Sequence, residues 1–275
     1  MRMMFWMVRL RHTKRGIMTE TLFGNLEKIA IERLQEFEKV ALSKHPDGYY
    51  LAYSGGKDSD VILDLAKRSG VKFTAYYHLT TCDPPELVYH VRTHPEVEIV
   101  KPKMTMWQLI RKKGFLPRRN VRYCCDYFKE NGVKSKGRMV VTGVRWEESK
   151  RRSSRRMIET CFRQKTKQYL NPIIDWSRKD VWDYISSNKI SYCSLYDEGF
   201  ARIGCVLCPM TSVVQTQIEM ERWPKIAKAW RRAFWKGFDV SKTMFPNKRI
   251  AWEWWLKRDE PKTKKKDNQI MFFED

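Results

Sequence analysis

The fold is decided by residues 49–59, which read YYLAYSGGKDS. The apolar run Tyr49–Tyr53 predicts a buried strand, and the glycine pair after it predicts a tight loop. Val61–Lys67 has helical spacing and ends at Gly70, where helices favour glycine. Val71–Tyr77 then predicts a second strand. Strands that alternate with helices predict an α/β fold, a parallel sheet with helices on both faces.

Further elements follow the same logic along the chain. Thr21–Ser43 has the apolar spacing of a helix, and Ser177 is a good cap for the helix that follows it. The other expected strands are Val97–Val100, Arg138–Thr142 and Tyr169–Ile173, and the other expected helices are Trp107–Lys113, Asp126–Glu130, Thr211–Phe238 and Arg249–Arg258. We expect three parts: a basic N-terminal arm and helix (1–44), a nucleotide-binding α/β domain with a cysteine site (45–210) and a basic, Trp-rich helical C-terminal region (211–275).

Composition narrows the class of protein. The chain has 275 residues, a net charge of +22 and seven cysteines. Such a charge favours a polyanionic partner, nucleic acid above all, although high solubility also explains it. No apolar run is long enough for a membrane span. The stretch Met1–Gly16 lacks the order of a secretion signal and is either a basic arm or an extension upstream of a start at Met18. An odd number of cysteines in a large chain favours a reduced, cytoplasmic protein with a metal site.

The glycine loop predicts a phosphate site at the start of the helix. Glycines let backbone N–H groups approach phosphate oxygens, and the helix dipole adds positive charge there. We expect Lys57 to neutralise phosphate charge, and Asp58 to cap the helix or hold a magnesium-bound water. The spacing differs from that of the P-loop of kinases and GTPases. The expected nucleotide-binding residues are Ser54, Gly55, Gly56, Lys57, Asp58, Ser59 and Gly143.

Four cysteines form a candidate metal site. Cys124 and Cys125 are adjacent, and Cys205 and Cys208 form a C-x-x-C pair. Four thiolates suit either a zinc ion or a [4Fe–4S] cluster. Structural zinc is the commoner occupant, whereas adjacent cysteines are unusual for zinc, so the residues alone leave both open. Buried cysteines without a metal are the third alternative. The remaining thiols have no partner at ligand spacing; they are Cys82, Cys161 and Cys193.

The order of several motifs resembles a known family. The chain contains His78–Thr81 with Asp83–Glu86, Arg122–Cys125, Thr142–Arg145 with Glu148-Ser149, Pro172–Trp176 and Gly204–Pro209. With the loop SGGKDS, they resemble the PP-loop ATP pyrophosphatases, which cleave ATP between its α and β phosphates. Within that superfamily the chain is similar to the sulfonucleotide (phosphoadenosine phosphosulfate) reductase family, in its iron–sulfur branch. The similarity covers about residues 45–210.

The resemblance implies a cofactor and further site residues. It implies ATP with Mg²⁺ at the loop and a [4Fe–4S] cluster on Cys124, Cys125, Cys205 and Cys208, with zinc as the alternative. Lys129 matches the lysine that compensates cluster charge and faces the substrate anion. Arg145–Arg152 resembles an arginine-rich lid, in which Arg145 is the strongest candidate for a phosphate contact. Individual roles for Arg151, Arg152, Arg155 and Arg156 stay open, because a solvated basic loop explains them equally well.

The sequence departs from the reductases at one point. Their catalytic cysteine lies near the C-terminus, whereas this sequence has none after Cys208. We therefore expect an enzyme that adenylates a substrate for sulfur insertion, in nucleic acid, with a sulfur donor or redox protein as a further partner. Proteins of DNA phosphorothioation and transfer-RNA thiolases show similar combinations of motifs. The alternatives are a sulfonucleotide reductase without its usual cysteine and a non-catalytic nucleotide-binding accessory protein. The sequence leaves the oligomeric state open.

The C-terminal region interleaves tryptophan with cations. Such a surface can stack bases and hold phosphates. The favoured interpretation is that the indoles pack the helices together while the cations face water. The residues concerned are Trp223, Trp230, Arg231, Arg232, Trp235, Trp252, Trp254 and Trp255.

Overall fold

The computed structural model describes residues 20–21, 24–130, 135–161 and 166–257. Its main sheet has six strands in the order β5-β4-β3-β6-β8-β7. All printed pairings are parallel except that of β7 with β8 at one edge. The predicted α/β fold with a mainly parallel sheet is confirmed. The strands are β3 (Tyr49–Tyr53), β4 (Phe73–His78), β5 (Val97–Val100), β6 (Met139–Val141), β7 (Ile158–Thr160) and β8 (Gln168–Leu170).

Strand register follows the apolar runs. In β3, Leu51 lies opposite Val141 of β6, and Val141 lies opposite Leu170 of β8. All three side chains are at most 1% exposed. Strands that are buried on both faces read as continuous apolar runs, which explains why β3 and β6 are visible in the sequence.

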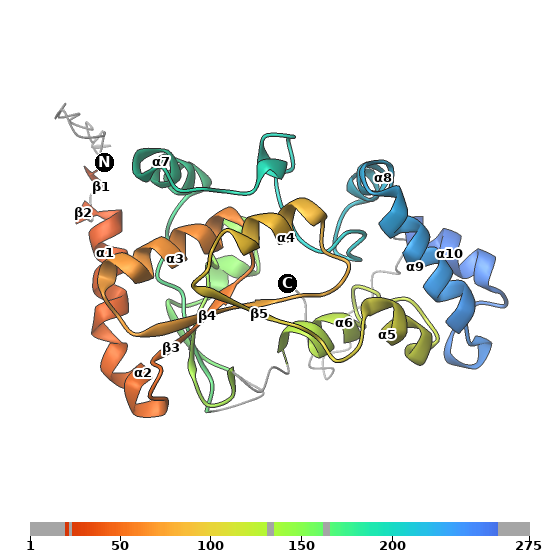
Figure 1. The fold of residues 1–275 in the computed structure, drawn as a ribbon, viewed down its shortest axis with the longest axis horizontal. Coiled ribbons are helices and arrows are strands. Elements are labelled where there is room, and N and C mark those ends of the chain that lie inside the picture. Colours follow the sequence, from red (N-terminus) through yellow and green to blue (C-terminus); the bar gives the residue numbers. More distant parts are fainter. Residues whose placement is uncertain (1–19, 22–23, 131–134, 162–165, 258–275) are drawn as a thin grey trace, which may run out of the picture. The chain divides into compact units, whose positions relative to one another are not determined.

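Contacts divide the chain into two compact units. The first contains residues up to Leu51, Lys57–Phe73 and Gly137–Ser191. A small hairpin of β1 (Glu20–Thr21) and β2 (Gly24–Asn25) precedes its first helix. Helices α1 and α7 both pack on α3 (Figure 1). The helices of this unit are α1 (Leu26–Glu36), α2 (Glu38–Lys44), α3 (Lys57–Ser69) and α7 (Arg178–Asn188).

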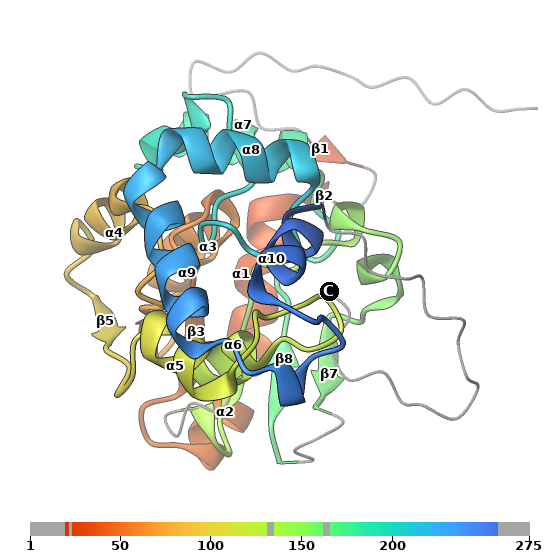
Figure 2. The ribbon, with the colours of Figure 1, turned by 90° about the vertical axis from the view of Figure 1, so that its right-hand side faces the viewer.

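The second unit contains Ala52–Gly56, Thr74–Lys136 and the chain from Tyr192 onward. Its C-terminal helices pack together, and α9 also lies along α5 (Figure 2). Four of the tryptophans are buried here, at 1–7% exposure, as the packing interpretation predicts: Trp223, Trp230, Trp252 and Trp255. The helices are α4 (Pro85–Arg92), α5 (Met106–Lys113), α6 (Tyr123–Cys125), α8 (Val213–Arg222), α9 (Pro224–Gly237) and α10 (Lys248–Lys257).

Several predicted boundaries shift for identifiable reasons. The helix expected over Thr21–Ser43 begins at Leu26, where the Asn25 side chain accepts from two backbone N–H groups, and it breaks at Phe37. The helix expected over Thr211–Phe238 is two helices, because Pro224 cannot donate a helical hydrogen bond and instead begins α9. Ser177 caps α7 as predicted. The sequence analysis missed α4 and the edge strand β7.

Some expectations stay untested. The basic arm Met1–Gly16, the start at Met18 and the tail Pro261–Asp275 lie outside the described residues. The boundaries predicted at residues 44 and 210 stay predictions. Within the described part of the chain, no helix combines the length and apolar character that crossing a membrane requires.

A buried arginine supports the first unit. Arg138 is 2% exposed, and its Nη2 donates to the carbonyl oxygens of Asp47, Gly48 and Tyr49 at 2.8–3.2 Å. We expect Arg138→Met to lower the free energy of unfolding by about 3 kcal/mol, because three buried carbonyls lose a charged donor. Urea denaturation measures this. The exposed control Arg92→Met should change it by less than about 0.5 kcal/mol, and an equal effect of both variants would contradict the role of Arg138.

Candidate functional site

The loop between β3 and α3 has a shape that only glycine permits at its centre. Gly55 has φ +71°, and a Cβ added there would lie 2.5 Å from Leu87 Cδ1 and 2.9 Å from Val91 Cγ2, both on α4. A Cβ at Gly56 would lie 3.3 Å from the Tyr196 hydroxyl. The Ser54 Oγ accepts from the Gly56 N–H at 3.4 Å. Close packing against α4 and the positive φ together require glycine at position 55.

The first turn of α3 carries a bridging carboxylate. One Asp58 oxygen accepts from Lys57 Nζ at 2.8 Å, and the other accepts from Arg145 Nε at 2.7 Å. Arg145 is 3% exposed and also donates to Glu147 at 3.2 Å and to the Trp176 carbonyl at 3.2 Å. Asp58 thus joins two cations at the start of the helix instead of capping it.

Gly143 lies against the same turn. A Cβ added to Gly143 would lie 3.0 Å from the Asp58 carbonyl oxygen and 3.1 Å from the Asp58 Cβ. The strand β6 ends two residues earlier, so the sheet edge brings Gly143 and Arg145 to the start of α3. Four predicted residues therefore meet in the first unit: Lys57, Asp58, Gly143 and Arg145. Ser59 is 4% exposed on the same helix, whereas Ser54 is exposed.

This end of α3 is suited to binding an anion. The helix has 13 residues, and its first N–H groups and dipole favour negative charge. The Lys57 ammonium lies at the same turn but is only 6% exposed and is paired with Asp58 at 2.8 Å. Arg145 is 3% exposed and held by Asp58, Glu147 and the Trp176 carbonyl, and its predicted phosphate contact stays a prediction.

The four predicted cysteines gather in the second unit. Cys124 and Cys125 lie on α6, and Cys205 and Cys208 lie in the loop before α8. The Cys124 thiol interacts electrostatically with the other three. In the C-x-x-C turn, Leu207 adopts φ +59° and its N–H donates to the buried Glu219 carboxylate at 2.6 Å. A buried acid thus fixes the turn that presents Cys205 and Cys208.

Lys129 lies beside the cysteine site. It belongs to the π-helical turn Asp126–Glu130 directly after α6, and it interacts with Cys125, Cys205 and Cys208. Its side chain is exposed to solvent. Its role toward a substrate anion stays a prediction.

The sequence analysis did not predict that Thr80, Cys82 and Asp83 belong to the cysteine site. The Thr80 hydroxyl lies 3.4 Å from Cys82 Sγ and 3.3 Å from Cys205 Sγ, so Cys82 is a fifth thiol of the site. Cys205 Sγ is 3.8 Å from an Asp83 oxygen. The Val206 N–H donates to the Cys82 carbonyl at 2.9 Å. The position of Cys82 after strand β4 was the only indication in the sequence that it belongs to this site. No other cysteine lies at ligand spacing from it.

Electrostatics separate the thiols into different states. The neighbouring Cys82 thiol, and then Lys129, lower the pKa of Cys205 against the effect of burial. Burial and the nearby Cys205 raise the pKa of Cys208 to about 12. The Cys205 thiolate in turn raises the pKa of Lys129. Cys205 is therefore the thiol of the site that is most readily ionised.

The arginines of the basic segment after Arg145 are either ion-paired or exposed to solvent. Arg152 pairs with Glu148, and Arg155 lies 3.6 Å from Glu159. Arg151 and Arg156 are exposed. Their predicted roles remain open, because the contacts of this segment fit both a lid and a solvated loop.

Comparison with known proteins places the chain in a family. The phosphoadenosine phosphosulfate reductase domain matches residues 48–211. Two uncharacterized proteins of Methanocaldococcus jannaschii are 29% and 26% identical, over 77% and 81% of this chain and 45% and 58% of theirs. The chain therefore spans about half the length of these relatives.

Shorter relatives have named activities. Adenosine 5′-phosphosulfate reductase 1 of Bacillus subtilis is 26% identical over 69% of this chain and 85% of its own. The solved phosphoadenylyl-sulfate reductase of Candida auris is 25% identical, with a TM-score of 0.49, over 66% of this chain and 92% of its own. Since the family match covers more than half of the sequence, the chain belongs to the phosphoadenosine phosphosulfate reductase domain family.

Proposed function

We propose that the chain is an enzyme that binds ATP at Ser54–Ser59 and adenylates nucleic acid for sulfur insertion. The observation that carries the proposal is the ion-paired start of α3, where Asp58 holds Lys57 and Arg145 beside a loop that only glycines can form. Such a loop binds phosphate oxygens through backbone N–H groups. Membership of the reductase family supports the proposal that the bound nucleotide contains adenine.

The proposed reaction follows from the charges at this site. An oxygen of the substrate attacks the α-phosphorus of ATP, and the bond to the β-phosphate oxygen breaks, which releases pyrophosphate. Lys57 and the N-terminus of α3 stabilise the negative charge that develops on the phosphates, and Mg²⁺ accompanies the nucleotide. Arg145 acts through Asp58, as a positioning residue. Sulfide from a donor then attacks the activated atom of the substrate, and AMP leaves with the adenylated oxygen.

We further propose that Cys124, Cys125, Cys205 and Cys208 hold a [4Fe–4S] cluster. Four thiolates suit either a zinc ion or a [4Fe–4S] cluster. We favour the cluster because adjacent cysteines, here Cys124 and Cys125, are unusual as zinc ligands. When bound, the cluster supplies electrostatic or redox chemistry beside Lys129.

The charge of the chain supports nucleic acid as the substrate. A net charge of +22 attracts polyanions over a long range and is more than a small sulfonucleotide requires. The second candidate is a sulfonucleotide reductase, which the named reductases among the relatives favour. In that case Lys129 would face the sulfonucleotide anion.

Product analysis separates the two candidates. Anaerobically purified protein is incubated either with ATP and nucleic acid or with adenosine 5′-phosphosulfate and a thiol reductant. We expect pyrophosphate in the first mixture and no sulfite in the second. Sulfite release without pyrophosphate would establish the reductase, and nucleotide binding without either product would favour an accessory protein.

A further inference from the structure

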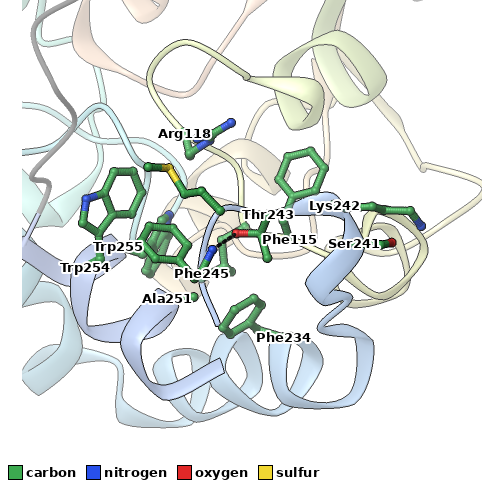
Figure 3. Close-up of a pocket in the computed structure, with 12 residues that line it drawn as sticks. Phe115, Arg118, Phe234, Ser241, Lys242, Thr243, Phe245, Ala251, Trp254 and Trp255 are labelled. Atoms are coloured by element: carbon green, nitrogen blue, oxygen red, sulfur yellow. Dashed lines mark hydrogen bonds between the residues drawn. The ribbon is translucent and has the colours of Figure 1, made fainter. Parts of the chain in front are cut away.

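A pocket of about 310 Å³ opens among the C-terminal helices of the second unit (Figure 3). Its lining comes from the segment before α6, from α9, from the turn between α9 and α10, and from α10. The aromatic part of the lining is formed by Phe115, Phe234, Phe245, Trp254 and Trp255. The volume is at the lower end of what small-molecule sites enclose, which suits one flat ring system.

The two tryptophans of the pocket, Trp254 and Trp255, differ in their exposure. Trp255 is 3% exposed, and its indole N–H donates to the Pro117 carbonyl at 2.7 Å. Trp254 is only half-buried and lies against Phe245, with ring centroids 4.9 Å apart. Trp254 therefore offers ring surface to the pocket, whereas Trp255 fixes its floor.

Cations accompany the rings. The Arg118 guanidinium lies 6.0 Å from the Phe115 ring centroid, and its buried Nε has no hydrogen-bond partner among the described residues. Lys242 also lines the pocket and pairs with Asp239 at 3.0 Å. The pocket contact of Arg118 therefore has to come from the rest of its guanidinium group, which carries a positive charge and further N–H donors.

The surroundings carry an excess of positive charge. Residues 224–257, which form α9, the following turn and α10, contain nine lysines and arginines and two acidic residues. Both acids are paired, Asp239 with Lys242 and Glu253 with Arg249 at 3.0 Å. A pocket that is lined by both aromatic rings and polar side chains, on a basic surface, matches a ligand that combines a ring with phosphates.

We propose that this pocket binds a nucleobase of a nucleic-acid strand whose phosphates lie on the basic surface of α9 and α10. The base stacks on Trp254, and a ring nitrogen or carbonyl oxygen accepts from Arg118. Stacking on aromatic side chains tolerates all four bases, so the pocket holds the strand and does not select its sequence. The proposal rests on nucleic acid being the substrate and adds where one of its bases binds.

Binding of labelled oligonucleotides tests the pocket. Fluorescence anisotropy compares a single-stranded oligonucleotide of about 16 nucleotides with an abasic oligonucleotide of the same length. We expect Trp254→Ala to weaken binding of the first by about tenfold and to leave the second unchanged, because only the first has a base to stack. Trp254→Phe should restore most of the affinity. Lys242→Ala should reduce the salt dependence of binding to both.

Ile250→Ala is the matched control, since Ile250 is 45% exposed on the same helix and does not line the pocket. Thermal melting confirms that each variant is folded. If Trp254→Ala weakens binding of both oligonucleotides equally, or of neither, the pocket takes no base. Pyrophosphate release by the unmodified chain is measured separately, so a failure of the pocket is distinguishable from a failure of the proposed reaction.

Discussion

The Cys205→Ser variant should lose the iron that we expect the anaerobically purified chain to carry, about four irons and four sulfides. Cys205 is one of the four proposed ligands, and the Cys82 thiol and Lys129 lower its pKa. A serine hydroxyl is a poor ligand for an iron–sulfur cluster, so the remaining three thiolates should hold it weakly. Colorimetric iron and sulfide assays and the visible absorption spectrum measure the loss.

Cys161→Ser is the matched control for this variant. Cys161 is a half-buried thiol that belongs to the first unit, whereas the cysteine site belongs to the second. The Cys161→Ser variant should retain the full iron content. One zinc per chain with no iron in the unmodified protein would overturn the cluster, and an equal loss of iron in both variants would overturn the assignment of Cys205.

The second large effect is expected at Asp58. Asp58→Asn keeps the size of the side chain but removes both ion pairs, to Lys57 and to the buried Arg145. An unpaired buried charge is costly, so we expect the turn to shift. A displacement of about 1 Å at a reacting group costs about 100-fold in rate, and we expect that loss in the kcat for pyrophosphate release, with a smaller change in KM.

Asp64→Asn controls for a lost carboxylate on the same helix. Asp64 pairs with Arg68 at 2.8 Å and accepts from the Tyr184 hydroxyl at 2.7 Å. The Asp64→Asn variant should release pyrophosphate at the rate of the unmodified chain. If Asp58→Asn retains full activity, the bridge between Lys57 and Arg145 does not position the loop.

The sequence predicted the elements whose causes are local. The glycine loop lies where the apolar run Tyr49–Tyr53 ends, and Ser177 caps α7 through its own side chain. The strands of a buried parallel sheet are visible because both faces are apolar. Edge strand β7 has only three residues and no buried side chain, so its pattern carries no such signal.

Contacts between segments that are distant in the chain could not be predicted from the sequence. Nothing in the spacing of Asp58 and Arg145, 87 residues apart, indicates that they form an ion pair. Cys82 and Cys205 are similarly remote, and the Thr80 hydroxyl that contacts both sulfurs is visible only in three dimensions. The contacts of Arg145 with Glu147 and with the Trp176 carbonyl were likewise not visible in the sequence, and they motivate the proposed positioning role.

The products formed from ATP test the proposed reaction most directly. Anaerobically purified chain is incubated with ATP, Mg²⁺, a sulfur donor and nucleic acid, and the nucleotides are separated by anion-exchange chromatography. We predict AMP and pyrophosphate in equal amounts, formed only when nucleic acid is present and about 100-fold more slowly by Asp58→Asn. ADP with inorganic phosphate, or unchanged ATP despite a full complement of iron, would contradict adenylation by this chain.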